Sequence, residues 1–441
     1  MEAFAFNRKV FFSIINYQLL MLKYYRLFLY INLCSLLHNT DVWAWQSTPI
    51  LNKSIGFKFE NENLRSITLP IKVFHNLVLV GVRINGSFDM DFILDTGVQT
   101  TILTEPVLCS VLQIKTGRAV QLRGLGVGDT IAAQLASDVR ISLGQAHGQN
   151  MNLLVLPSEA LSFSDFLGMP VYGIIGYDLF QDFVVEINYT DKWLRLHRPD
   201  KYKAPKKFKS ADIELNHTKP YLNTNIYTCD SLLFKQKLLL DTGSSQAVSL
   251  NRNEVDMPTK TIEAFLGKGL SGLVLGDIGY ICALEMAGFS FKKIIAGFPT
   301  AESLGAGGQT NILWNGSIGG EIFKRFRIIF DYTHQKVYFK PNYYFKAAFE
   351  YNLSGIEMHA LPPDFKTVKV SYVRPKSISE DADIQIGDEI LSINGLSPQN
   401  TFIGDLYEEL NKKSGYVVNL KILREGVVLK KKIILKETLS D

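Results

Sequence analysis

The segment FILDTG at residues 92–97 decides how the rest of the chain is interpreted. An apolar run ends there in Asp-Thr-Gly, which predicts a buried strand that delivers the Asp95 carboxylate at a tight turn. Such a turn is unusual, because a buried charge is costly unless it is paired or hydrogen-bonded. The segment LLLDTG at residues 238–243 repeats the pattern with Asp241, 146 residues after Asp95. Two such turns in one chain suggest two carboxylates that meet.

Each turn belongs to a longer internal repeat. Residues 173–180, GIIGYDLF, are echoed 143 residues later by residues 316–323, GSIGGEIF. The match continues without a gap from residues 183–190 to residues 326–333. Short apolar runs between Gly, Asn and Asp turns predict that both copies are built from β-strands.

Composition agrees with an ordinary globular protein that is rich in strands. The chain has 441 residues, of which 46% are hydrophobic and 20% charged, and its 33 glycines suit tight turns. A net charge of +4 gives no argument for a nucleic-acid partner. No Cys or His residues stand at metal-ligand spacing, so neither a metal nor a cofactor is expected.

Two neighbouring carboxyl groups predict acid–base chemistry. Like charges disfavour the doubly ionised form, so Asp95 and Asp241 would share a proton. One would then act as general base on a water, while the other, protonated, hydrogen-bonds a substrate carbonyl. The residues expected to support this pair are Thr96, Gly97, Thr242, Gly243 and Ser244.

Gly-rich stretches follow each turn at residues 124–128 and 267–272. They are candidates for hairpin flaps that cover a cleft and exclude water. The flap candidates are Gly124, Gly126, Gly128, Gly269 and Gly272.

The doubled DTG, with GIIG at residues 173–176 and SIGG at residues 317–320, resembles the aspartic peptidases. The lobes look closer to the retropepsin-like kind than to the pepsins. The resemblance implies a mainly β fold of two pseudo-symmetric, closed β-barrel-like lobes, with Asp95 and Asp241 catalytic and the two threonines joined across the lobes. Val98 departs from the family pattern, in which Ser, Thr or Ala is usual after the first DTG.

The last ninety or so residues resemble a PDZ domain, as expected of bacterial peptidases with this layout. The resemblance rests on IGDEILSING at residues 386–395. It implies a groove that adds a peptide as an extra strand and captures the C-terminal carboxylate of that peptide. The expected carboxylate-binding loop is formed by Ser354, Gly355 and Ile356.

The predicted domains are an N-terminal segment at 1–44, lobes at 55–200 and 201–345, and a PDZ domain at 346–437. The basic run at 197–209 is interpreted as a solvated linker between the lobes.

The N-terminal segment reads as a signal peptide, with an apolar core too short for an ordinary membrane span. The whole segment acting as a membrane anchor remains the alternative. The protein is therefore expected to be exported, to the periplasm, the cell envelope or the medium.

The four cysteines are Cys34, Cys109, Cys229 and Cys282. They are interpreted as buried apolar residues. A Cys109–Cys229 or a Cys229–Cys282 bridge stays open for an exported protein.

The combined hypothesis is an aspartic endopeptidase that acts on peptide or protein substrates. Its PDZ domain would recruit a substrate or a partner through a C-terminal peptide, and no nucleic acid is expected. The alternative hypothesis is a catalytically inactive, peptidase-like scaffold that binds peptides through the PDZ groove.

Overall fold

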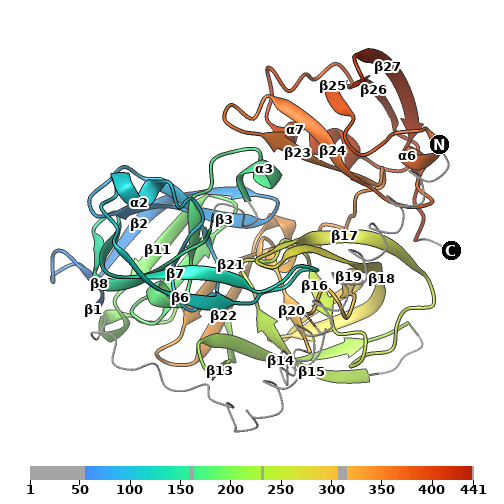
Figure 1. The fold of residues 1–441 in the computed structure, drawn as a ribbon. Helices are drawn as coiled ribbons and strands as arrows, with labels where there is room; N and C mark the ends of the chain where they lie inside the picture. Colours follow the sequence, from blue (N-terminus) through green and yellow to red (C-terminus); the bar gives the residue numbers. More distant parts are fainter. Residues whose placement is uncertain (1–54, 158–162, 230–232, 306–314, 440–441) are drawn as a thin grey trace, which may run out of the picture. The chain divides into compact units, whose positions relative to one another are not determined.

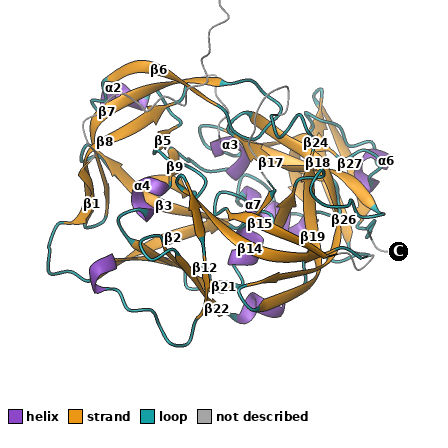
Figure 2. Ribbon diagram, turned by 90° about the horizontal axis from the view of Figure 1, so that it is seen from below, coloured by secondary structure: helices purple, strands orange, loops and turns teal. Residues whose placement is uncertain are grey.

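The computed structural model describes residues 55–157, 163–229, 233–305 and 315–439. The chain is mainly β, as predicted, and its helices are short (Figure 2). The N-terminal segment at 1–44 and Cys34 lie outside the described residues. No helix in the described ranges is long and apolar enough to cross a membrane.

The first half of the chain contains a closed barrel of six strands (Figure 1). The order is β3-β4-β9-β5-β8-β7, and pairing of β3 with β7 closes the ring. The strands are β3 (Leu77–Ile84), β4 (Met90–Leu94), β9 (Gly173–Ile175), β5 (Ile102–Leu103), β8 (Ala146–Val155) and β7 (Ile131–Leu143). Strand β3 is apolar along most of its length because nearly all of its residues are buried.

The second half repeats this barrel strand for strand. The order is β14-β15-β20-β16-β19-β18, closed by pairing of β14 with β18. The strands are β14 (Lys219–Tyr227), β15 (Leu233–Leu240), β20 (Gly316–Ile318), β16 (Val248–Leu250), β19 (Phe289–Pro299) and β18 (Gly272–Met286).

A run of six antiparallel strands joins the two halves, in the order β12-β22-β21-β10-β11-β2. The strands are β12 (Lys209–Asp212), β22 (Lys336–Pro341), β21 (Phe326–Asp331), β10 (Val184–Asn188), β11 (Trp193–His197) and β2 (Ser66–Phe74). Strands β10 and β21 pair at its centre, where Glu186 lies opposite Ile329. These two residues are also equivalent in the repeat, so the halves are related by a pseudo-twofold axis there.

A hairpin extends from each barrel. Strand β6 (Thr116–Leu122) pairs with β7 in the first half, and β17 (Thr261–Gly269) pairs with β18 in the second. Strand β6 was not expected from the sequence, since most of its residues are polar or small and exposed. Smaller elements complete the halves: β1 (Ile55–Phe59), β13 (Glu214–Asn216), α2 (Leu108–Val111), α3 (Phe163–Leu167), α4 (Tyr177–Phe180), α5 (Gly320–Phe323), η1 (Pro199–Lys201) and η2 (Tyr343–Lys346).

The C-terminal module is a five-stranded antiparallel sheet with two helices and its own apolar core. Its elements are β23 (Ile356–Leu361), β24 (Thr367–Val373), α6 (Ile378–Asp381), β25 (Glu389–Ile393), α7 (Ile403–Leu410), β26 (Val417–Arg424) and β27 (Val427–Ile434). Helix α7 buries Ile403, Leu406 and Leu410 against the sheet, one turn apart along the helix.

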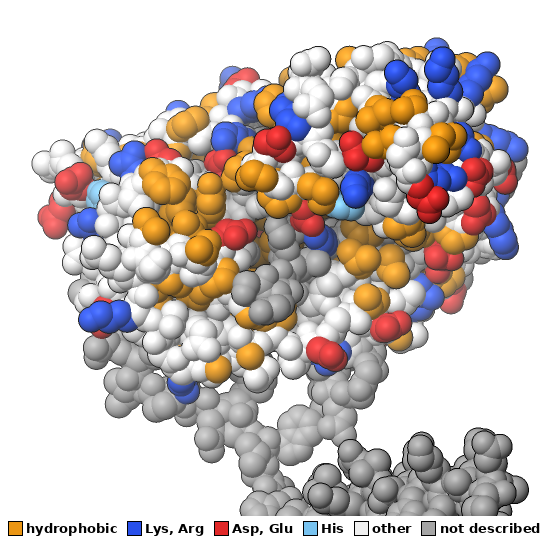
Figure 3. All heavy atoms as spheres, turned by 45° about the horizontal axis from the view of Figure 1, so that its top comes forward, with side chains coloured by type: hydrophobic (Ala, Val, Ile, Leu, Met, Phe, Trp, Pro, Cys, Tyr) orange, Lys and Arg blue, Asp and Glu red, His pale blue; other side chains and the backbone are white. Residues whose placement is uncertain are grey.

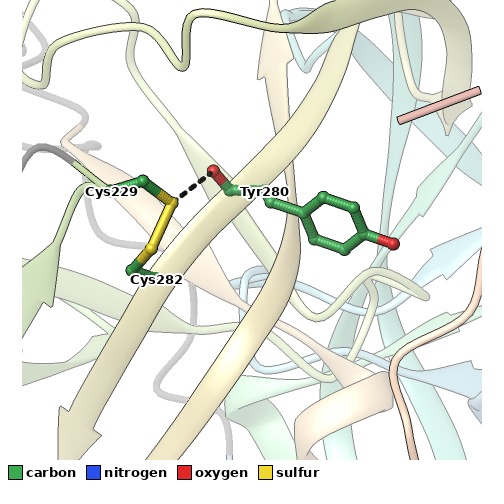
Figure 4. The surroundings of a disulfide bond; sticks show 3 residues. All are labelled: Cys229, Tyr280 and Cys282. Carbon is green, nitrogen blue, oxygen red and sulfur yellow. Dashed lines mark hydrogen bonds between the residues drawn. A yellow bond between two sulfur atoms is a disulfide. The ribbon is translucent and has the colours of Figure 1, made fainter. Parts of the chain in front are cut away.

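A disulfide joins Cys229, just after β14, to Cys282 on β18 (Figure 4). Both residues are exposed, so the interpretation of these two cysteines as buried apolar residues is wrong. Of the two bridges left open, the structure contains Cys229–Cys282, and Cys109 is a free, half-buried thiol. The bond ties the edge of the second barrel to the base of its hairpin.

Candidate active site

The two aspartates are delivered by equivalent strands. Strand β4 runs parallel to β9 and ends at Asp95, whose N–H donates to Ile175 O at 2.9 Å. Strand β15 runs parallel to β20 and ends at Asp241, whose N–H donates to Ile318 O at 2.9 Å. The strands with the Gly-containing repeats therefore hold both turns from behind.

The glycine after β9 permits this close approach. A Cβ atom at Gly176 would lie 2.1 Å from Asp95 O and 2.4 Å from Val98 O. Any side chain there would push the first DTG turn out of place.

Thr96 and Thr242 interlock beneath the aspartates with two-fold reciprocity. Thr96 Oγ1 donates to Leu240 O at 2.5 Å, and Thr242 Oγ1 donates to Leu94 O at 2.8 Å. Each hydroxyl also accepts from the backbone N–H of the other threonine, at 3.0 Å in both cases. Both threonines are fully buried, so these four bonds fix the two turns relative to each other without competition from water.

The carboxyl groups of Asp95 and Asp241 adjoin each other across the two turns: a Cβ at Gly97 would lie 3.0 Å from Asp95 Oδ1 and 3.8 Å from Asp241 Oδ1, and a Cβ at Gly243 would lie 2.4 Å from Asp95 Oδ2. Each also accepts from a turn glycine, Asp95 Oδ1 from Gly97 N at 2.6 Å and Asp241 Oδ1 from Gly243 N at 3.0 Å. Two buried carboxylates this close together disfavour the doubly ionised form, so this arrangement favours one proton shared by the pair.

Burial raises the pKa of both aspartates. For Asp241, burial and then the nearby Asp95 charge raise the pKa to about 7. For Asp95, burial raises the pKa, while the hydrogen bond from Gly97 and the charge of Lys219 oppose the rise. Both shifts favour retention of a proton by the pair.

The five candidate flap glycines meet where the two hairpin tips touch. Four hydrogen bonds join the tips. They run from Gly124 N to Ser271 Oγ (3.1 Å), Val127 N to Leu273 O (3.0 Å), Gly128 N to Ser271 O (2.5 Å) and Ser271 N to Leu125 O (3.0 Å).

Glycine is needed at this contact. Gly126 has a φ of +128°, and a Cβ there would lie 2.5 Å from Gly272 N. Gly269 approaches Leu125 O so closely that a Cβ would lie 2.1 Å away. The tips can therefore interlock backbone against backbone.

One cavity near the second DTG turn has a volume of about 520 Å³. Its lining includes Ser245 and Gln246, just after the second DTG, and Leu266 and Gly267 on β17. Neither catalytic candidate lines it. The cavity lies beside the loop that follows Asp241 and the second hairpin, and residues of the C-terminal module, among them Glu357, Arg374 and Tyr407, line its other side.

The two residues after the DTG triplets differ in their surroundings. Val98 packs against the apolar cluster of the first half, and its carbonyl accepts from Tyr177 N at 2.9 Å. Ser244 donates its N–H to Asp241 O at 3.3 Å, and its hydroxyl lies close to Gly319. Val98 is thus accommodated as a packing residue beside the first DTG turn.

Two residues near the site were not found in the sequence. The positive charge of Lys219 on β14 opposes the rise in the pKa of both aspartates. Ser303 is fully buried, and its carbonyl accepts from Gly126 N at 2.7 Å, which anchors the first tip. Neither stands in a recognisable motif, so the sequence carried no signal for them. In the described part of the chain, no group of three or more His, Cys, Asp or Glu residues is arranged to hold a metal.

The predicted carboxylate-binding loop of the C-terminal module has no backbone donors to spare. Asn352 Oδ1 accepts from Ser354 N at 3.0 Å and from Gly355 N at 3.3 Å, and Ser354 Oγ accepts from Ile356 N at 3.1 Å. A peptide carboxylate needs free N–H groups in such a nest. The assignment of these three residues to carboxylate binding therefore disagrees with the structure.

The surface between β23 and α7 is covered by the first half of the chain. A Cβ at Gly168 would lie 2.4 Å from Ile403 Cγ2 on α7 and 3.6 Å from Ala360 Cβ on β23. The His75 ring stands edge-on to Tyr407 on α7, with ring centroids 4.8 Å apart. A peptide could enter here only by displacing these contacts.

One family model matches part of the first half of the chain. Residues 80–179 match the family model described as aspartyl protease. A search of curated proteins gave no match. Among solved structures, the chain is similar to an aspartic proteinase from Irpex lacteus, with a TM-score of 0.41 and 13% sequence identity, over 64% of this chain and 99% of that one. The family match spans Asp95, the GIIG segment and α4, and this part of the chain is therefore similar to aspartyl proteases.

Proposed function

We propose that this protein is an aspartic endopeptidase, with Asp95 and Asp241 as its catalytic residues. The observation that carries the proposal is the pair of buried, adjoining carboxyl groups, held from below by the Thr96–Thr242 interlock. An ordinary strand-ending turn has no need of a second, symmetry-related carboxyl group. The family match over residues 80–179 adds support for the first half.

The proposed reaction uses one proton shared by the pair. Ionised Asp95 removes a proton from a water, whose oxygen attacks the substrate carbonyl carbon, while protonated Asp241 donates a hydrogen bond to the carbonyl oxygen. The proton on Asp95 then passes to the leaving nitrogen as the C–N bond breaks. Both products leave without a covalent enzyme intermediate.

Access to the pair requires movement of the hairpins. The four hydrogen bonds between the tips must break to admit a peptide, and they can re-form over the bound substrate. The cavity beside Ser245, Gln246 and Gly267 is the proposed site for one substrate side chain.

Localisation and partner recruitment are also proposals. The Cys229–Cys282 bridge favours an oxidising compartment outside the cytoplasm, which agrees with the expected export signal. Recruitment of a peptide by the C-terminal module would require it to replace Gly168 and His75 beside α7.

Three variants test the catalytic assignment. Asp95→Asn and Asp241→Asn should each lower kcat/KM for an unstructured protein substrate by at least about a hundredfold. Asp89→Asn is the matched control, since Asp89 pairs with Arg83 on the exposed surface of the first half. Full activity in either active-site variant would exclude the assignment.

The alternative, an inactive scaffold, predicts a different set of results. The wild type would cleave no peptide from mildly acidic to neutral pH, and binding of a statine-type peptide would be the same in wild type and the Asp241→Asn variant. No contact in the described residues favours this alternative.

A further inference from the structure

A second, strongly basic cavity lies away from the aspartates, above the strands that join the two halves. Its volume is about 300 Å³. Strands β11 and β21 and the segment after η1 contribute to its lining, together with Arg65 just before β2. The cationic residues of the lining are Arg65, Arg195, Lys201, Lys203 and Arg327.

The single carboxylate in this cavity is fully used. Glu186 is buried, with Oε1 accepting from Arg327 Nε at 2.5 Å and Oε2 lying 2.9 Å from His197 Nε2. Burial alone would raise the pKa of Glu186, but the hydrogen bonds with His197 and Arg327 outweigh it and lower the pKa. Five cationic side chains thus face one carboxylate, which leaves an excess of positive charge.

Two of the guanidinium groups are held near each other by one indole ring. Arg195 and Arg327 each lie 4.8 Å from the centre of the Trp193 ring. Among the described residues, both side chains form their hydrogen bonds through Nε, with Arg195 donating to Thr68 Oγ1 at 2.9 Å. Stacking fixes the two planes and leaves their terminal N–H groups for another acceptor.

Further donors in the cavity have no acceptor. The Tyr202 hydroxyl is buried and has no hydrogen-bond partner in the described residues. Within the same described ranges, Arg65 and Lys203 have no acidic partner. Lys201 has a distant one, since its Nζ lies 3.9 Å from Asp200 Oδ2 at the rim of the cavity. A buried donor without a partner is costly, and a bound acceptor would remove that cost.

The repeat shows that the fold does not require this charge. The residues equivalent to Glu186, Arg195 and Arg327 in the other half are Ile329, Tyr338 and Val184. Those three form a small apolar cluster, onto which Tyr202 and Phe208 of the connecting segment pack. On one side of the pseudo-twofold axis the surface is therefore apolar and covered by Tyr202 and Phe208, and on the other side the equivalent surface is cationic.

The excess of positive charge is confined to the surroundings of this cavity. The whole chain has a net charge of only +4, and on the face drawn in Figure 3 positive and negative side chains are interspersed. The segment at 197–209, interpreted above as a solvated linker, is instead anchored by Tyr202 and Phe208, and this holds Lys201 and Lys203 over the cavity.

We propose that this cavity binds a phosphate group, carried by a small phosphate ester or by a lipid headgroup. Arg65, Arg195, Arg327 and Lys203 supply charge, and Tyr202 supplies a neutral donor. A tetrahedral dianion suits several donors that converge from two strands and a loop better than a carboxylate, which has one charge and one plane. The site is separate from the aspartate pair and does not depend on the proposed peptidase activity.

Calorimetric titration of the full chain with inorganic pyrophosphate tests the proposal. The Arg65→Gln/Lys203→Gln variant should weaken binding by at least about tenfold, and Tyr202→Phe by several-fold, because charged and neutral hydrogen bonds are lost. The control is Lys421→Gln/Lys430→Gln, which removes the same charge from paired positions on β26 and β27. Absence of pyrophosphate binding by the wild type, or equal weakening in the control, would overturn the proposal.

A vesicle assay separates the two sources of phosphate. Phosphatidylcholine vesicles with and without phosphatidic acid are compared for wild type and the Arg65→Gln/Lys203→Gln variant. A difference that depends on phosphatidic acid and disappears in the variant identifies a lipid headgroup. Pyrophosphate binding without that difference identifies a soluble phosphate ester.

Discussion

Replacement of Thr96 by Val tests whether the threonine interlock holds the two halves in register. Valine has nearly the same shape, so the change leaves no cavity and removes only the hydroxyl. Two buried groups then lose their partner: Leu240 O, which accepts from Thr96 Oγ1 at 2.5 Å, and Thr242 N, which donates to it at 3.0 Å. Each unsatisfied buried group costs about 1–3 kcal/mol, which gives a loss of about 2–6 kcal/mol in the free energy of unfolding.

The matched control is Thr96→Ser, which keeps the oxygen and removes one methyl group. It should cost only about 0.5–1.5 kcal/mol. Equilibrium urea unfolding, followed by tryptophan fluorescence, measures both variants against the wild type. If the valine variant is no less stable than the serine variant, the interlock does not stabilise the junction and the reasoning fails.

Three further predictions follow from the same contacts. The pKa of Asp241 is raised from 3.8 to about 7 in the folded state, so between these pH values folding takes up a proton. The free energy of unfolding should therefore fall as pH rises through this range, by up to about 1.4 kcal/mol per pH unit. Thermal unfolding of Asp241→Asn should show a weaker dependence of stability on pH than the wild type, and an equal dependence would contradict the shift. Gly126→Ala should speed amide hydrogen exchange at the hairpin tips, because its Cβ would lie 2.5 Å from Gly272 N and push the tips apart. Exchange in the barrels should stay as in the wild type. If the tips of the variant exchange as slowly as those of the wild type, their contact is not as described. The Cys229→Ser/Cys282→Ser variant should lose about 2–4 kcal/mol in urea unfolding, because the bond closes a loop with a separation of 53 residues, and wild-type stability would show that the bridge does not form.

The strands that carry the aspartates were predictable because their signal is local and repeated. An apolar run before Asp95 and another before Asp241 mark strand ends, and the repeat makes chance coincidence improbable. The threonine contacts then follow from symmetry. The contact between the hairpin tips could not be predicted, because no local sequence pattern indicates that residues 124–128 face residues 267–273.

The local sequence could settle neither the state of the carboxylate loop nor the cysteine bridge. The carboxylate loop was assigned from Ser354, Gly355 and Ile356 alone, whereas Asn352, two residues upstream, takes up their backbone donors in an Asx turn. The cysteine bridge could not be chosen from sequence, because pairing depends on the distance between strands and not on spacing along the chain.

The segment between β11 and β12 has a consequence for how the protein behaves on dilution. Because this segment joins the two halves covalently, their association is intramolecular, and the halves stay together however dilute the protein becomes. Encoding both halves in one chain also lets a substitution alter one carboxyl environment and leave the other untouched. Val98 beside Asp95 and Ser244 beside Asp241 are such a difference, and an assembly of two identical chains could not have acquired it.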